Sequence, residues 1–121
     1  MTIVQQSRSI ADPIARWWTA VHDTAVQFEQ ILTPDPEATP QAAWGQLMTQ
    51  LHTMTGDLKR VPYTSVTSDA HHNLLHATDY LYRCYEQLIQ ANLEEARFYY
   101  NNALIQVTQL HQFLVDNNLT I

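Results

Sequence analysis

The chain of 121 residues has very few residues that interrupt regular structure. It contains only two glycines, Gly45 and Gly56, and five prolines, which are Pro13, Pro34, Pro36, Pro40 and Pro62. Because proline and glycine are the residues that most often break helices, long helices can form between these positions. The scarcity of glycine also excludes the glycine-rich loops that bind phosphates in nucleotide-binding proteins.

Cysteine and positive charge are scarce as well. The lone Cys84 excludes a disulfide within the chain, so we expect a cytoplasmic protein. Six Lys and Arg against twelve Asp and Glu give a net charge of −6, and no basic patch for a nucleic-acid partner is present. No apolar run approaches the roughly eighteen residues of a membrane span, and no signal-peptide pattern occurs. We therefore expect neither nucleic-acid nor membrane partners, and no export.

A helical pattern dominates what the chain does have. Apolar residues make up 45% of the sequence, which is enough for the core of one domain covering residues 1–121. In four segments they recur at spacings of three and four residues, as in helices with one buried face. The predicted helices span about 13–32, 40–60, 69–91 and 93–116. We expect residues 1–11 to form a flexible or loosely packed N-terminal segment.

The ends of these helices also carry recognisable signals. Asp12 before Pro13, Thr39 before Pro40, Ser68, and Asn92 each have the residue type that caps a helix N-terminus. Glu95 follows Asn92 at the spacing of a reciprocal cap. Pro62 is expected to end the second helix.

The apolar stripes of consecutive helices match when the chain folds back on itself. Folding about residue 36 pairs Val21 with Leu51 and Trp18 with Met54. Folding about residue 92 gives the pairs Leu88–Ala96, Cys84–Tyr100, Leu81–Ala103, Ala77–Val107 and Leu74–Leu110. Two such hairpins predict an all-α, antiparallel up-down-up-down four-helix bundle.

A histidine-rich stretch is the clearest candidate for chemistry. His71 and His72 are followed by His76 and Asp79, and His72 and His76 are one helical turn apart, a spacing that suits zinc. This local spacing is similar to the histidine pair of metal-dependent DinB-like bundle enzymes. The stripe of Leu74 places His72, His76 and Asp79 on the solvent side, so the site would need a further ligand from another helix. A metal site at His72, His76 and Asp79 is the alternative hypothesis, with a divalent metal as its only cofactor.

Other bundle chemistries are not supported by the sequence. The chain is similar in length to histidine phosphotransfer domains, but the lysine and glycine that follow their phosphorylated histidine are replaced after His72 by Leu75 and His76. The Glu-x-x-His pairs of di-iron bundles are also absent. Cys84 lies on an apolar stripe and should be a buried, unreactive thiol. We therefore expect a non-enzymatic protein.

Several apolar residues lie off the predicted stripes. They are Tyr82, Ile89, Phe98 and Ile105, and five of the six tyrosines fall between Tyr80 and Tyr100. Surplus apolar and aromatic residues of this kind either cover the core near the hairpin turn or form a partner surface. The leading hypothesis is a non-enzymatic protein that associates with itself or with another protein through the last two helices. A ligand pocket lined by Trp17, Trp18 and Trp44 is a third hypothesis.

Overall fold

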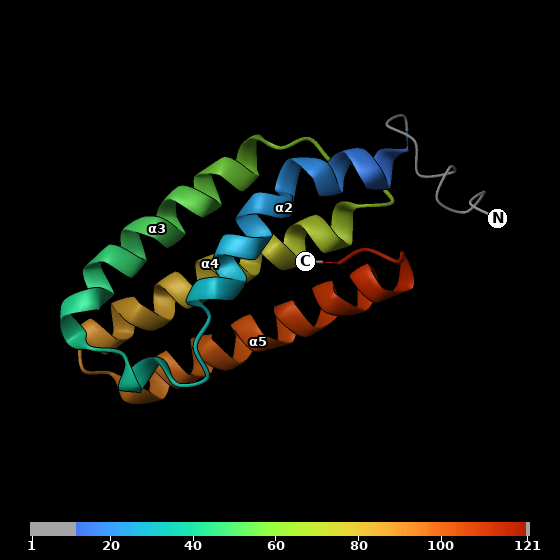
Figure 1. Ribbon diagram of the computed structural model, residues 1–121. Helices are drawn as coiled ribbons and strands as arrows, with labels where there is room; N and C mark the ends of the chain where they lie inside the picture. Colours follow the sequence, from blue (N-terminus) through green and yellow to red (C-terminus); the bar gives the residue numbers. More distant parts are fainter. Residues whose placement is uncertain (1–11, 121) are drawn as a thin grey trace.

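The computed structural model describes residues 12–120, which form four α-helices and no strand (Figure 1). The helices are α2 (Pro13–Ile31), α3 (Gln41–Arg60), α4 (Ser68–Ile89) and α5 (Leu93–Asp116), with a short 3₁₀ helix, η1 (Pro36–Ala38), before α3. Each predicted helix end lies within two residues of the observed one, which confirms the all-α four-helix prediction. The expected flexible segment 1–11 lies outside the described residues.

The hairpin of α4 and α5 is the centre of the bundle. Figure 1 shows these two helices side by side, with α3 packed next to α4. Helix α2 covers the end where α3 stops and α4 begins, and its own C-terminus lies near the middle of the bundle. Residues 32–40, which we call the connector, then run along the remaining half to the start of α3.

Two of the expected helix caps are confirmed. Asp12 Oδ1 accepts the backbone N–H of Ile14 at 2.9 Å, and Pro13 begins α2. The side chain of Asn92 accepts the N–H of Glu95 at the start of α5. Both contacts satisfy N–H groups that have no partner within the helix.

The other two expected caps are wrong. Pro40 rather than Thr39 precedes α3, and no side chain caps that end. Ser68 is the first residue of α4, and Thr67 occupies the position before it. The Thr67 hydroxyl accepts the N–H of Thr64 at 3.0 Å, so it closes the α3–α4 loop instead of capping the helix.

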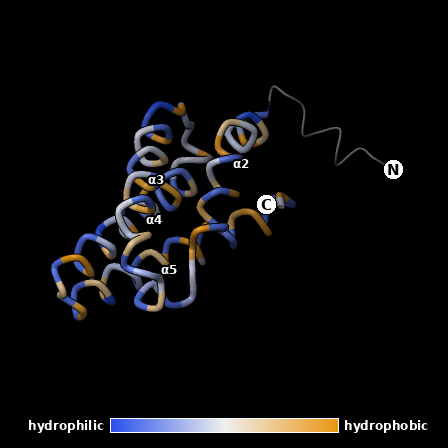
Figure 2. The backbone as a smooth tube through the Cα atoms, turned by 60° about the vertical axis from the view of Figure 1, so that its left-hand side comes forward, coloured by the Kyte–Doolittle hydropathy of each residue, from blue (hydrophilic) through white to orange (hydrophobic). Residues whose placement is uncertain are grey.

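The core consists of two hydrophobic clusters. One includes Phe28, Leu51 and Met54 together with most of the α4–α5 interface, and the other includes Trp17, Trp18, Val21 and Leu58. Figure 2 shows hydrophobic and hydrophilic residues alternating around the turns of each helix, which gives each helix a buried side. The two members of each predicted pair of the second hairpin lie in the same cluster.

Two predicted pairs of the first hairpin are divided between the clusters. Val21 and Trp18 lie in the cluster of Leu58, whereas Leu51 and Met54 lie in the other cluster. The reason is the connector, because its prolines keep it from continuing either helix and let it extend along the bundle. Helix α2 is therefore displaced toward the C-terminal end of α3.

The turn from α4 to α5 contains an alanine in a left-handed conformation. Ala91 has φ 60°, a value that costs alanine about 1 kcal/mol or more and glycine almost nothing. The N–H of Asn92 donates to the carbonyl of Gln87 at 2.9 Å, and the N–H of Ala91 donates to that of Leu88 at 3.0 Å. This hydrogen-bond pattern ends α4 and requires the left-handed residue at position 91.

Ala91→Gly should therefore stabilise the protein by about 1 kcal/mol and raise its Tm by roughly 4 °C in thermal unfolding. Ala20→Gly, at an exposed helical position in α2, is the control and should lower stability by about 1 kcal/mol. Equal destabilisation by both changes would contradict the conformation of the turn.

Candidate functional site

A buried histidine, His71, connects three helices. The indole N–H of Trp17 in α2 donates to His71 Nδ1 at 3.0 Å, and the His71 ring is also hydrogen-bonded to the backbone of Leu58 in α3. The ring stacks on Tyr63 with centroids 4.6 Å apart, and only 2% of the residue is exposed. Because Nδ1 accepts a hydrogen bond from the Trp17 N–H, Nδ1 carries no proton. His71 is therefore neutral, with its proton on Nε2.

Burial holds the pKa of His71 below its ordinary value. Desolvation is the main cause, the charge of neighbouring His72 lowers the pKa further, and the hydrogen bond to Leu58 opposes both effects. Protonation of the ring would add a hydrogen to Nδ1, and this new N–H would face the N–H of Trp17. The contact between α2 and α4 therefore requires the neutral ring.

The residues of the expected metal site do not gather around one point. His72 is half-buried, and its Nδ1 lies 2.8 Å from the backbone oxygen of Ser68. Its ring centroid is 5.9 Å from that of His76, while Asp79 accepts a hydrogen bond from Arg83 at 2.9 Å. Within residues 12–120, no three His, Cys, Asp or Glu form a group that could hold a metal ion. The metal hypothesis stays a prediction.

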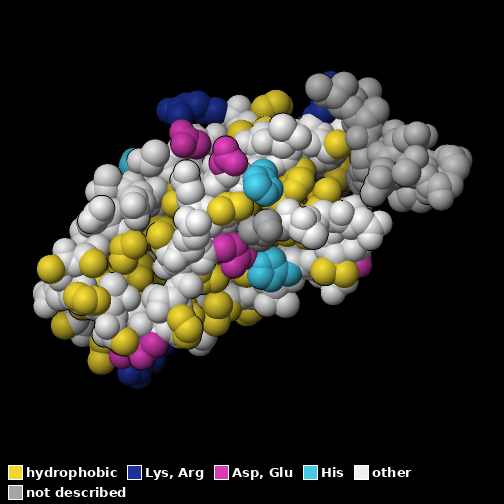
Figure 3. All heavy atoms as spheres, viewed as in Figure 1, with side chains coloured by type: hydrophobic (Ala, Val, Ile, Leu, Met, Phe, Trp, Pro, Cys, Tyr) yellow, Lys and Arg dark blue, Asp and Glu magenta, His cyan; other side chains and the backbone are white. Residues whose placement is uncertain are grey.

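The expected interface residues differ in exposure. Phe98 is 57% exposed, and Ile89 and Ile105 are each 52% exposed. Tyr82 is half-buried, with its ring 6.2 Å from that of His52. Seven large apolar residues are exposed in the described range, and five of them lie in the α4–α5 hairpin: Ile89, Leu93, Phe98, Ile105 and Val115. Figure 3 shows hydrophobic side chains gathered at the end of the bundle where α3 begins.

One side of α5 combines apolar residues with a complete lack of charge. No Asp, Glu, Lys or Arg occurs from Phe98 to Val115. Phe98 and Ile105 are seven residues apart and therefore lie on one line along the helix. We call the exposed residues on this side the α5 outer face: Phe98, Asn101, Ile105, Thr108, Gln109, Gln112 and Val115.

Aromatic contacts support one edge of the α5 outer face. The Phe98 ring meets Tyr99 edge-on with centroids 5.5 Å apart, and Tyr99 stacks on Tyr80 of α4 at 6.2 Å. The guanidinium carbon of Arg83 lies 6.0 Å from the Tyr99 ring centroid. Phe98 is therefore exposed while one edge of its ring contacts Tyr99.

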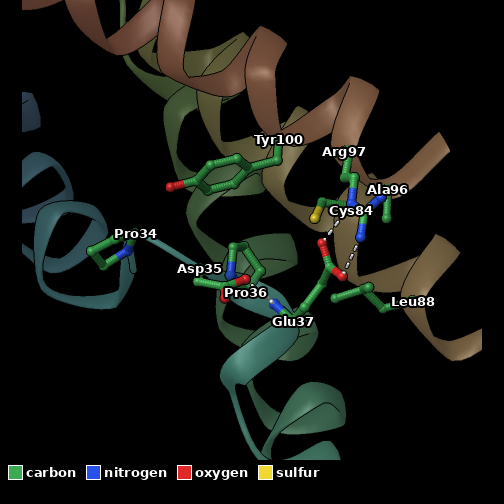
Figure 4. A pocket seen from close by; sticks show the side chains of 9 residues that line it. All are labelled: Pro34, Asp35, Pro36, Glu37, Cys84, Leu88, Ala96, Arg97 and Tyr100. Carbon is green, nitrogen blue, oxygen red and sulfur yellow. Dashed lines mark hydrogen bonds and ion pairs between the residues drawn. The ribbon is translucent and has the colours of Figure 1, made fainter. Parts of the chain in front are cut away.

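A cavity of about 140 Å³ lies where the connector crosses α4 and α5 (Figure 4). Arg97 donates from Nε and a terminal nitrogen to the two carboxylate oxygens of Glu37, at 2.8 and 2.9 Å. The hydroxyl of Tyr100 donates to the carbonyl of Thr33 at 2.6 Å. The lining residues are Pro34, Asp35, Pro36, Glu37, Cys84, Leu88, Ala96, Arg97 and Tyr100.

Glu37 and Arg97 neutralise each other at this cavity, and Asp35 adds one further negative charge. The hydrogen bonds from Arg97 lower the pKa of Glu37 and those to Glu37 raise the pKa of Arg97, so both stay ionised. Burial, with a smaller effect of the Glu37 charge, raises the pKa of Cys84 to about 12. Cys84 is 2% exposed and is a neutral thiol, as the sequence predicted. It acts as an apolar wall rather than a nucleophile.

The three tryptophans do not line a common pocket. Trp17 and Trp18 are buried in one cluster, whereas Trp44 packs against the other. The indole N–H of Trp44 donates to the carbonyl of Thr39 at 3.1 Å, which fastens the connector to α3. The expected tryptophan pocket is therefore wrong, because the displaced α2 separates these residues.

Sequence reasoning missed His71 as a structural residue and missed the cavity. His71 shares the buried side of α4 with Leu74, Thr78 and Tyr85, a spacing that is visible in the sequence. The Glu37–Arg97 pair joins residues 60 positions apart, which no local pattern indicates.

Comparison with protein-family models, curated proteins and solved structures finds no match for this chain. In the described part of the chain, every helix is too short or too polar to cross a bilayer. The candidate sites therefore have to be interpreted from their own geometry.

The low pKa of His71 predicts a loss of stability in mild acid. The unfolded chain binds a proton at His71 near pH 6.5, whereas the folded chain does not until a lower pH. The contribution of His71 to the free energy of unfolding should thus be constant above pH 6.5. Below pH 6.5 it should decrease, by at most about 1.4 kcal/mol per pH unit.

Urea unfolding between pH 8 and 5 measures this effect. His71→Gln keeps an acceptor for Trp17 and a donor for Leu58, and it should remove the His71 share of the slope. His52→Gln, at an exposed position, should leave the slope as in the original protein. Identical slopes in all three proteins would show that His71 does not cause the acid sensitivity.

Proposed function

We propose that this protein acts by self-association, with two copies docking through the α5 outer face in a non-enzymatic role. The observation that carries the proposal is the pair Phe98 and Ile105, both more than half exposed on a side of the helix without charge. Exposed apolar residues that share one surface are typical of protein interfaces. Burying them against a second copy removes this apolar area from water.

A second copy suits this face better than a charged partner does. The chain carries a net charge of −6, so most approaches of two copies are opposed by repulsion. The residues of the α5 outer face carry no charge, and the carboxylates of the helix, Glu94, Glu95 and Asp116, lie beyond its two ends. Its polar members include Asn101, Gln109 and Gln112, and amides both donate and accept hydrogen bonds. Gln109 Oε1 already accepts a hydrogen bond from Asn73, and Gln112 Nε2 already donates one to Asp116. The amide group of each that is not used in these bonds can pair with the second copy.

The spacing of these residues fits a two-fold symmetric contact. Ile105 lies midway between Phe98 and Gln112 in the sequence. If two α5 helices pack antiparallel around an axis at Ile105, then Ile105 meets its own copy and Phe98 lies opposite Gln112. Asn101 then lies opposite Gln109, so that amides face amides. The contact has an apolar centre and a polar rim, as interfaces usually do.

Light scattering across a concentration series tests the proposal. We expect a mass that rises to twice the 14.0 kDa of one chain. Ile105→Asp should raise the dimer dissociation constant at least about a hundredfold, because it buries two facing carboxylates. Thr49→Asp, at an exposed position on α3, is the matched control and should leave the mass curve unchanged.

Cysteine cross-linking provides a second readout. Ile105→Cys should form a disulfide-linked dimer under mild oxidation, whereas Thr49→Cys should not, and the buried Cys84 should not react in either variant. A monomeric mass at every concentration would overturn the proposal. A dimer that forms only with added zinc would overturn it too and would favour the histidine hypothesis.

A further inference from the structure

The cavity beneath the connector follows from the placement of α2. Helix α2 ends at Ile31, so the fourth position of the bundle beside the first turns of α5 is filled by the connector instead of a helix. The connector faces two small residues there, Cys84 of α4 and Ala96 of α5. Small side chains opposite an extended segment leave the space of about 140 Å³.

The walls of this cavity are mostly apolar. Leu88 and Ala96 come from the hairpin, and Pro34 and Pro36 come from the connector (Figure 4). Cys84 adds a neutral thiol, because burial raises its pKa to about 12. A molecule that fills this space would therefore exchange water for hydrocarbon, sulfur and aromatic contacts.

The polar groups at the mouth are occupied by one another. Glu37 accepts two hydrogen bonds from Arg97, and Asp35 Oδ1 accepts the backbone N–H of Glu37 at 3.1 Å. The Tyr100 hydroxyl is used by Thr33. A charged ligand would lose its hydration on entering the apolar space, and an anion would in addition be repelled by Asp35, both of which are costly. The chemistry of the site therefore favours a neutral molecule.

We propose that this cavity is a binding site for a small neutral apolar molecule, of the size of a single aromatic ring. Apolar cavities of about 150 Å³ bind benzene in proteins, so the volume is sufficient for six or seven heavy atoms. A ligand of that size binds with a dissociation constant on the order of 1 mM. The Glu37–Arg97 pair lies at the edge of the mouth, which is open to solvent, so a ligand can enter without breaking it.

Amide NMR spectra of the full chain, recorded during a benzene titration, test the site. We expect saturable shifts at Cys84, Leu88 and Ala96 that fit one dissociation constant, with no comparable shifts around Trp17. Benzoate and benzylammonium carry the same ring with a negative or a positive charge. Both should bind at least about tenfold more weakly than benzene, because each loses the hydration of its charge in the apolar space, and Asp35 also repels benzoate.

Two variants separate cavity binding from non-specific uptake. Ala96→Leu fills the cavity and should abolish the saturable shifts, while Ala42→Leu, at an exposed position on α3, should leave them unchanged. Since Ala96→Leu can strain the core, Ala96→Val provides a milder filling that should weaken binding several-fold. Absence of saturable shifts in the original protein, or unchanged binding in both Ala96 variants, would overturn the proposal. Tighter binding of either charged ring would overturn the inference that the ligand is neutral.

Discussion

The hydrogen bond from Trp17 to His71 determines where α2 lies, and the rest of the surface depends on that placement. Both partners are almost fully buried, at 3% and 2% exposure. Moving α2 by one turn would leave a buried donor and a buried acceptor without partners, at a cost of about 1–3 kcal/mol each. The same shift would also remove the Trp17 ring from its edge-on contact with Phe113. These contacts therefore select one register of α2.

Because α2 covers one end of the bundle, the connector covers the other end. There its residues line the cavity and supply Glu37, the partner of Arg97. The Glu37–Arg97 pair fixes η1 against the first turns of α5 and draws the cation toward the connector. Beyond this pair, the stretch of α5 from Phe98 to Val115 contains no Asp, Glu, Lys or Arg. One helix consequently carries both proposed sites, with its first turns lining the cavity and its later turns forming the association surface.

The fold was largely predictable, and the residues show why. Helix limits followed from apolar spacing and from prolines, and the second hairpin register followed from small residues such as Ala103 facing large ones such as Leu81. The first hairpin register was not predictable, because the sequence does not determine how far a connector with prolines extends along the bundle. Exposure of Phe98 and Ile105 could be predicted from their position off the stripe. Burial of His71 could not, because a histidine at the border of a stripe suits either water or a core hydrogen bond.

The central functional claim is that two copies meet through α5 at Ile105. An isotope-filtered NOE experiment on an equal mixture of ¹³C-labelled and unlabelled chains detects only contacts between copies. The account predicts intermolecular NOEs from the Ile105 methyl groups to Ile105 and from the Phe98 ring to Gln112. Intermolecular NOEs confined to α3, or none at concentrations where light scattering reports a dimer, would contradict it.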